Sequence, residues 1–251
     1  MRFISFLQSS LNHTVKHYSG YFTTLIASLV VLFGGALATT LISLLSHKFF
    51  TAINIDLQSY VLLQGAYAIT GVIIMFVVIT FLSGLVVLSS LNTNGTRNNA
   101  RALADQFISY LFLNVLMVIV AFIATSPLIG ISLLQYTFHD TYNIISTLLL
   151  ISTLVLQVVV VIFFATTPFL MLDKKLHLKE TLQKNLKNVS ARFSLLAQRA
   201  VGLFLFLFII NFGLAVSEKT PLETLWALTI PLFFAPFLVS YLALTYKEIS
   251  N

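Results

Sequence analysis

NIISTLLLISTLVLQVVVVIFFATTPFLML occupies residues 143–172, and DKKLHLKETLQKNLKNVSARFSLLAQR follows it directly at residues 173–199. The first stretch has no charged side chain, whereas the second has seven Lys and Arg residues. A helix needs about 20 apolar residues to cross a bilayer, so the first stretch predicts a membrane span. The abrupt change to a basic segment indicates that the chain leaves the membrane there.

The rest of the chain shares this apolar character. Its 251 residues are 58% hydrophobic and 9% charged, and the mean hydropathy is +0.97. Soluble domains carry about 25% charged residues, so this chain has too few to cover a water-facing surface. We therefore predict a single membrane domain over residues 1–251.

Six long apolar blocks occur along the chain. They are continuous rather than alternating, which favours helices over the strands of a membrane barrel. The predicted fold is therefore an all-α polytopic bundle of six transmembrane helices, paired as three antiparallel hairpins, with amphipathic interfacial helices on the cytoplasmic side. The predicted spans cover residues 21–45, 62–91, 105–134, 143–172, 200–216 and 224–246.

Positive charges are distributed unevenly between the two sides of these spans. Twelve of the 14 Lys and Arg residues fall in alternate breaks, which are residues 1–20, 92–104, 173–199 and the end of the chain. Cytoplasmic loops collect Lys and Arg, so both termini are predicted to be cytoplasmic. The net charge of +6 is then explained by topology and by lipid headgroups, and no nucleic-acid partner is expected.

Two of the basic breaks are patterned as amphipathic helices. Apolar residues recur every three or four positions over residues 174–198, and Phe3, Leu7, Leu11 and Val15 do so over residues 1–20. We expect both helices in the inner headgroup layer, with the stripe in the acyl boundary; the alternative is that they only set the depth of the spans. The side chains expected to contact lipid headgroups or a partner protein are Lys174, Lys175, Lys179, Lys184, Lys187 and Arg192.

The two amphipathic segments are also similar to each other. Five residues of the first match five of the second at a constant offset, which is consistent either with a repeat of interfacial helix and span pair or with chance similarity. The matched residues are Leu11, Lys16, Ser19, Phe22 and Leu25 with Leu182, Lys187, Ser190, Phe193 and Leu196.

Ionisable side chains are missing from the middle of the predicted spans. All eight acidic residues lie at span ends or in loops, which disfavours an ion-coupled transporter because such proteins place ionisable groups inside the membrane. His13 and His17 stand one turn apart without a third ligand, and the chain has no Cys. We therefore expect no catalytic residue, no metal and no cofactor, and we predict that the protein is not an enzyme.

Neutral polar residues and prolines remain within the spans. Amides in spans usually bond to neighbouring helices; the functional alternative is a polar seam for a lipid headgroup or a small solute. Proline interrupts helices, so bends are expected, and a bend serves either packing or a gate. The amides are Gln64, Asn114, Gln157 and Asn211, and the prolines expected to bend helices are Pro168, Pro231 and Pro236.

The stretch TPFLMLDK at residues 167–174, followed by a basic helix containing NVSARF at residues 188–193, resembles the YciC family of bacterial inner-membrane proteins. More distantly, it looks like the membrane domain attached to some glycerophosphodiester phosphodiesterases. The resemblance implies a multi-pass protein of the Gram-negative inner membrane. It carries over no enzymatic residue, because the catalytic barrel of the phosphodiesterases is absent here.

Two functions are compatible with this sequence. The first is a scaffold or accessory protein in envelope or membrane maintenance, which works through contacts with membrane lipids and with another membrane protein. The second is a transporter or flippase-like carrier of a lipid or small amphipathic solute. The amphipathic helices favour the first, and the amides within the spans favour the second.

Overall fold

The computed structural model describes residues 3–52, 57–91, 96–137, 142–218 and 220–250. In these ranges the secondary structure is helical and includes no strand, which confirms the all-α prediction. The helices are α1 (Phe3–Ala52), α2 (Leu57–Leu91), α3 (Thr96–Thr137), α4 (Tyr142–Phe164), α5 (Thr167–Lys174), α6 (Leu178–Ala191), α7 (Phe193–Ser217), α8 (Pro221–Thr229), the π-helix η1 (Ile230–Phe234) and α9 (Ala235–Ser250).

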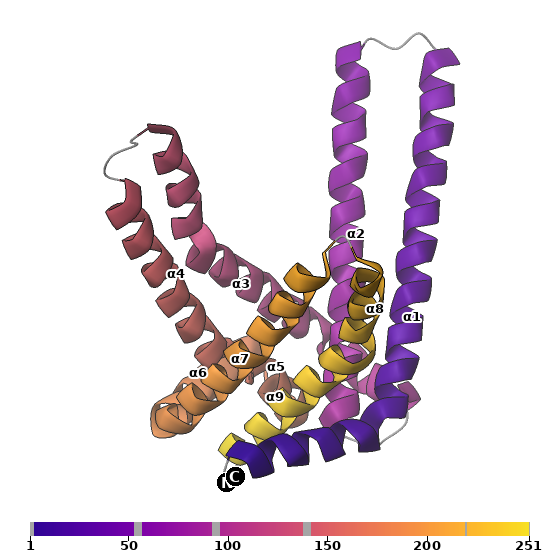
Figure 1. Ribbon diagram of the computed structural model, residues 1–251. Coiled ribbons are helices and arrows are strands. Elements are labelled where there is room, and N and C mark those ends of the chain that lie inside the picture. Colours follow the sequence, from indigo (N-terminus) through magenta and orange to yellow (C-terminus); the bar gives the residue numbers. More distant parts are fainter. Residues whose placement is uncertain (1–2, 53–56, 92–95, 138–141, 219, 251) are drawn as a thin grey trace.

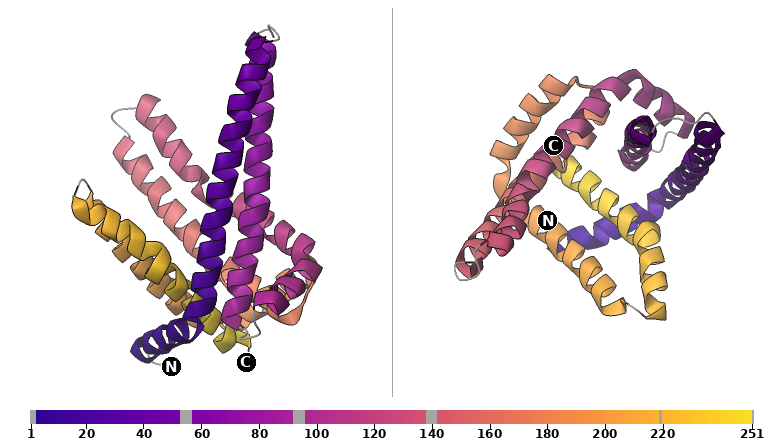
Figure 2. Two further views of the ribbon diagram at one scale, coloured as in Figure 1. Left: turned by 90° about the vertical axis from the view of Figure 1, so that its right-hand side faces the viewer. Right: turned by 90° about the horizontal axis from the view of Figure 1, so that it is seen from above.

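Three antiparallel arms rise from one end of the molecule (Figure 1). They are the pair α1 and α2, the pair α3 and α4, and the pair made by α7 with α8, η1 and α9. Figure 2 shows that the arms diverge and that both chain ends lie where the arms meet. We call this end the base; it consists of the first turns of α1, the helices α5 and α6, and the adjoining ends of the long helices.

Five segments of the described residues are long and apolar enough to cross a membrane. The chain is therefore a multi-pass helical membrane protein. The predicted first span, 21–45, falls within α1, but many of its side chains, among them all those of residues 41–45, lie outside the described part. The five segments are Ala68–Leu91, Asn98–Leu128, Ile145–Lys174, Phe193–Ser217 and Leu222–Ser250.

The predicted span 143–172 consists of two helices rather than one. Helix α4 ends at Phe164, and α5 begins at Thr167. Pro168 lies in the first turn of α5, where its missing N–H costs little, whereas in the middle of one continuous helix it would remove a backbone hydrogen bond. The chain therefore breaks its helix just before the proline.

The predicted basic helix 174–198 is shorter in the structure. Lys174 ends α5, and Lys175 then adopts a left-handed conformation, with φ 50° and ψ 46°. Helix α6 covers only Leu178–Ala191, and Arg192 separates it from α7. Residues 193–198, which the sequence pattern assigned to the interfacial helix, therefore form the first turns of the next span.

The core of the base surrounds α5. Five consecutive residues of this short helix, 168–172, are buried together with Thr167. They pack against α2, α3 and α9 through a cluster that includes Leu88, Leu103 and Tyr246. Because α5 is almost wholly enclosed, it joins the three arms at their common end.

A glycine permits the close approach of α2 and α3. Gly84 is buried, and a Cβ atom built on it would lie 2.6 Å from Leu103 Cδ1 and 3.1 Å from Tyr110 Cε1. Thr80, one turn earlier, is also buried. The small residues at these two positions thus leave room for the side chains of α3.

The first turns of α1, residues 3–20, form a segment that we call the tail; it runs along the base before the helix rises (Figure 1). Its buried face contains Phe6, Ser10 and Thr14, while the apolar side chains of Leu11 and Val15 are exposed. The tail therefore has a buried face that is partly polar and an exposed face that is apolar. One packs on the protein, and the other stays available to a membrane.

The apolar stripe of α6 packs against the protein, which corrects the expectation that it enters the acyl boundary. Val189 is buried, and Leu178 and Leu182 are partly buried against the core of the base. Among the stripe residues of α6, Leu186 is the exposed one. The same periodicity is expected of a helix whose stripe packs on protein and of one whose stripe packs on lipid. In α6 the stripe packs mainly on protein.

Candidate functional site

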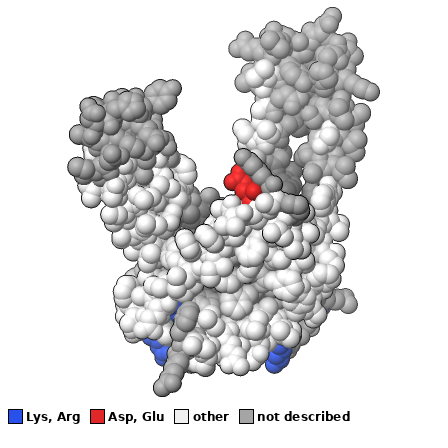
Figure 3. Space-filling view, viewed as in Figure 1, with Lys and Arg blue, Asp and Glu red and all other residues white. Residues whose placement is uncertain are grey.

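The base carries the basic side chains that the sequence assigned to headgroup or partner contact. All six are exposed, and they lie at the end of α5, along α6 and at the α6–α7 junction. In Figure 3 Lys and Arg lie at the base, whereas the acidic side chains visible there lie higher up, toward the far end of the α7–α8 hairpin. The six are Lys174, Lys175, Lys179, Lys184, Lys187 and Arg192.

Two of these six side chains have partners within the protein. Lys174 Nζ lies 3.2 Å from Asp173 Oδ2, and Arg192 Nη1 donates a hydrogen bond to the backbone carbonyl of Glu248. No ion pair joins the other four to an acid in the part of the chain that the structure describes. These four lysines present positive charge to solvent, where it would attract anionic headgroups.

Helix α6 is held in place by buried polar residues that sequence reasoning missed. Asn185 is buried, and its side-chain amide donates a hydrogen bond to the carbonyl of Phe163 in the last turn of α4. Thr167 Oγ1 donates to the same carbonyl at 2.9 Å. This carbonyl lies beside the break before Pro168, so Asn185 satisfies an acceptor that a continuous helix would pair with a backbone N–H.

A buried arginine joins the tail to the last two long helices. Arg199 is only 4% exposed, and its Nε and Nη2 atoms donate to Glu248 Oε2 at 3.2 and 2.8 Å. Its guanidinium carbon lies 3.5 Å from the ring centroid of Phe6. The Tyr241 hydroxyl donates to the Arg199 carbonyl at 2.9 Å, and the Tyr241 ring meets the Phe6 ring edge-on at 5.0 Å.

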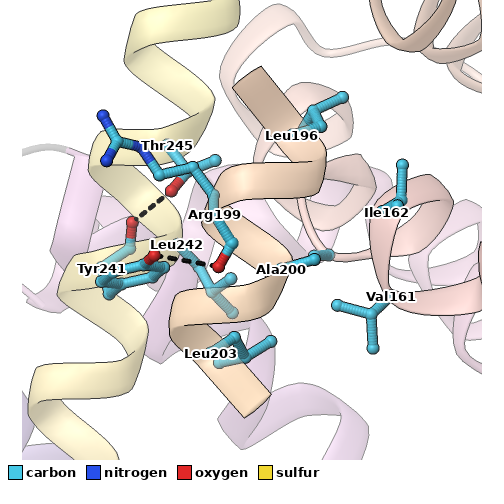
Figure 4. Close-up of a pocket in the computed structure, with 10 residues that line it drawn as sticks. Val161, Ile162, Leu196, Arg199, Ala200, Leu203, Tyr241, Leu242 and Thr245 are labelled. Carbon is cyan, nitrogen blue, oxygen red and sulfur yellow. Dashed lines mark hydrogen bonds between the residues drawn. The ribbon is translucent and has the colours of Figure 1, made fainter. Parts of the chain in front are cut away.

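Figure 4 shows Arg199, Tyr241 and Thr245 among the residues that line a small cavity between α4, α7 and α9. Its volume is about 10 Å³, which is room for about one water molecule. The sequence had counted Arg199 among the cytoplasmic charges. In the structure Arg199 is buried and forms an ion pair with Glu248 and a cation–π contact with Phe6. In the sequence, only the acidic residue Glu248 near the end of the last helix pointed to such a pairing.

Two further hydrogen bonds join α9 to distant segments of the chain. The Tyr246 hydroxyl donates to Asp173 Oδ2 at 2.6 Å, which ties α9 to the end of α5. The Tyr21 hydroxyl lies 3.0 Å from Ser240 Oγ and ties α1 to α9. Helix α9 is therefore fixed to α1, just after the tail, and to the centre of the base.

The span amides are not brought together by the hydrogen bonds described. Asn114 donates to the Tyr110 carbonyl at 2.9 Å, and Asn211 donates to the Leu207 carbonyl at 2.8 Å. Each of these bonds closes on the preceding turn of the same helix. Gln157 is partly buried on α4, and the side chain of Gln64 lies outside the described residues.

The two remaining prolines lie in the last arm. Pro231 is in η1, and Pro236 is buried in the first turn of α9. A π-helical turn is a common cause of an irregularity in a helix. The predicted span 224–246 is thus divided among α8, η1 and α9.

The histidine pair of the tail lies against the base. The rings of His13 and His17 stack at 4.3 Å, and His17 Nδ1 is 2.9 Å from the Ser89 carbonyl. Burial, and after it the charges of His17, Lys247 and Lys16, lowers the pKa of His13 to about 4. Burial likewise lowers the pKa of His17. Groups of three or more metal-ligating side chains do not occur among the described residues.

Comparison of the chain with known protein families, with curated proteins and with solved structures found no match.

Proposed function

We propose that this chain is a non-enzymatic protein of the bacterial inner membrane that acts as a scaffold or accessory protein in envelope maintenance. In this proposal it crosses the membrane six times, with both termini in the cytoplasm. Its basic base contacts anionic headgroups, and its arms contact another membrane protein or lipid. The resemblance to the YciC family supports the location.

The exposed apolar surface of the diverging arms is the observation that carries this proposal. The described spans are mostly unburied within one chain, with between 11% and 33% of each most apolar window enclosed. Large side chains such as Phe122 on α3, Leu154 on α4 and Phe208 on α7 are at least half exposed. Such surfaces in a membrane are suited to contact with lipid or with helices of a partner.

The length of α1 supports the sixth span. Its 50 residues extend over about 75 Å at 1.5 Å per residue. This length exceeds the hydrocarbon core of about 30 Å, so it accommodates both the tail and the span 21–45. Reporter fusions at each end test the topology; a periplasmic signal from either end would refute it.

Complementation of a deletion strain under envelope stress tests the scaffold function. Charge reversal at Lys184 and Lys187 should abolish complementation, because it removes the headgroup contact without disturbing any partner that the structure describes. The matched pair Gln157→Leu and Asn211→Leu should complement, because it alters polar groups within spans only. The opposite result favours the second candidate, a carrier of a lipid or small amphipathic solute. The irregular η1 segment around Pro231 supports this second candidate.

In vivo photo-cross-linking from the arms tests the partner contact. A photoreactive residue at Phe122, Leu154 or Phe208 should capture a second membrane protein if an arm contacts one. The same residue at the enclosed position Leu113 is the control, since it should capture only this chain. Capture at no arm position, together with normal complementation by the charge-reversed variant, would rule the scaffold out.

A further inference from the structure

An apolar groove lies between the tail and the last arm. Its volume of about 590 Å³ falls within the range of roughly 300–1,000 Å³ that is usual for ligand sites. The tail contributes Leu11, Val15 and Tyr18 to its walls. The last arm contributes Phe206 from α7, Phe233 from η1 and Phe237 from α9.

The aromatic wall of the groove is braced by ring contacts. The Phe206 centroid lies 4.9 Å from that of Phe237 and 5.3 Å from that of Phe234. Phe234 in turn lies 5.4 Å from the Trp226 ring. Because these rings already pack on one another, they do not collapse into the groove and fill it.

The tail wall has two hydroxyl groups, those of Thr14 and Tyr18. Thr14 lines the groove, but its Oγ1 donates to the Ser10 carbonyl at 2.8 Å. A mostly apolar groove with so few hydrogen-bonding groups is a poor site for ordered water. Hydrocarbon is the occupant that such a surface favours.

The groove is continuous with the surface that faces the membrane. Ile4, Leu11 and Val15 form an exposed apolar stripe on the tail, and they are 79%, 55% and 70% exposed. The opposite wall belongs to Phe193–Ser217 and Leu222–Ser250, both apolar enough to span a bilayer. A lipid chain in the surrounding membrane can therefore enter from the side.

The charges near the groove complement an anionic headgroup. Lys16 follows Val15 on the tail and is exposed, and Lys247 lies in the last turn of α9, against which the tail packs. The neighbouring Glu248 does not neutralise them, because its carboxylate is bound by Arg199. Both lysines lie near enough to His13, which precedes the groove-lining Thr14, to lower its pKa, so they add positive charge beside the tail wall of the groove.

We propose that this groove binds one acyl chain of an anionic phospholipid, with the headgroup phosphate near Lys16 and Lys247. The site requires only that the chain lies in a membrane, and it does not depend on a scaffold function. It would fasten the tail to the last arm by a lipid shared between them.

Native mass spectrometry of the detergent-solubilised protein tests this site. Phosphatidylglycerol and phosphatidylcholine with identical chains are added separately. The wild type should retain one phosphatidylglycerol molecule, and Val15→Trp should bind it roughly tenfold more weakly, because the indole occupies the groove. Ile4→Trp is the matched control: it places the same ring on the same stripe outside the groove, and it should retain the lipid.

Three results would overturn the proposal: equal retention by Val15→Trp and the wild type, equal retention of the two phospholipids, or a dimer that Val15→Trp abolishes. Size-exclusion profiles establish whether both Trp variants fold. Should Val15→Trp fail to fold, Phe233→Trp fills the groove from the other wall, with Phe208→Trp on the exposed face of α7 as its control. Failure of this test leaves the charge-reversal test at Lys184 and Lys187 unaffected.

Discussion

Replacement of Gly84 by alanine tests whether the base depends on the close approach of α2 and α3. The added Cβ would lie 2.6 Å from Leu103 Cδ1, about 1 Å inside an ordinary carbon–carbon contact of about 3.5–4.0 Å. Overpacking of this kind costs about 1–3 kcal/mol. The helix propensity of alanine offsets about 0.5–1 kcal/mol of that cost, so a net loss of about 1–2 kcal/mol is expected.

The matched control lies on the same helix. A Cβ on Gly65 would meet nothing within 4 Å, so Gly65→Ala should leave stability unchanged or raise it by about 0.5–1 kcal/mol. The free energy of unfolding is measured by titration with sodium dodecyl sulfate in mixed micelles, followed by the fluorescence of the single tryptophan, Trp226.

A double-mutant cycle separates the clash from other effects. Leu103→Ala alone should destabilise by about 2–5 kcal/mol, because it leaves a cavity in the core of the base. In combination, the new methyl at Gly84 enters that cavity, so the double variant should be more stable than the sum of the single effects. Equal stability of Gly84→Ala and Gly65→Ala, or strict additivity in the cycle, would refute the packing argument.

Three further predictions concern the ends of the helices. Arg199→Ala should destabilise the fold by about 3 kcal/mol in the same titration, because the carboxylate of Glu248 loses its partner. Glu248→Gln should lower the free energy of unfolding by less. A smaller loss for Arg199→Ala than for Glu248→Gln would contradict the ion-pair geometry. Lys175→Gly should stabilise by roughly 0.5–1 kcal/mol, because glycine adopts a φ of 50° without a Cβ penalty, whereas Lys175→Ala should show no gain. The pKa of His13 is lowered to about 4 in the docked tail, so the undocked state binds more protons below pH 6.5 and the tail should become accessible to protease as the pH falls from about 6.5 toward 4. Because the pKa of His17 is lowered as well, His13→Gln should reduce that pH dependence, and His13→Gln combined with His17→Gln should remove it.

The sequence was sufficient for the helical class and for the hairpin order. Long apolar runs leave the backbone no other way to satisfy its hydrogen bonds in lipid, and the short connections make neighbouring helices antiparallel. The break before Pro168 was harder to place. A proline inside an apolar run permits a kink, a π-helical turn or a new helix; in the structure Asn185, 22 residues further along the chain, donates to the Phe163 carbonyl at the break, and the sequence pattern did not indicate this contact.

Side-chain roles at the base were less accessible from the sequence. A period of three to four residues identifies a stripe on α6, but it does not say whether protein or lipid covers the stripe. The burial of Arg199 was hidden for a similar reason, since a charge next to a span suggests a headgroup contact until its partners, Phe6 and Glu248, are known. The span amides were identified as polar, yet Asn114 and Asn211 bond to their own helices.

The contact of Phe6 with Arg199 and Tyr241 has a consequence for biosynthesis. Phe6 leaves the ribosome before its two partners, which follow it by 193 and 235 residues along the chain. The tail therefore stays undocked until α7 and α9 have been synthesised. Until α9 is made, the Phe6 ring lacks its contact with Tyr241 and the Arg199 guanidinium lacks the carboxylate of Glu248.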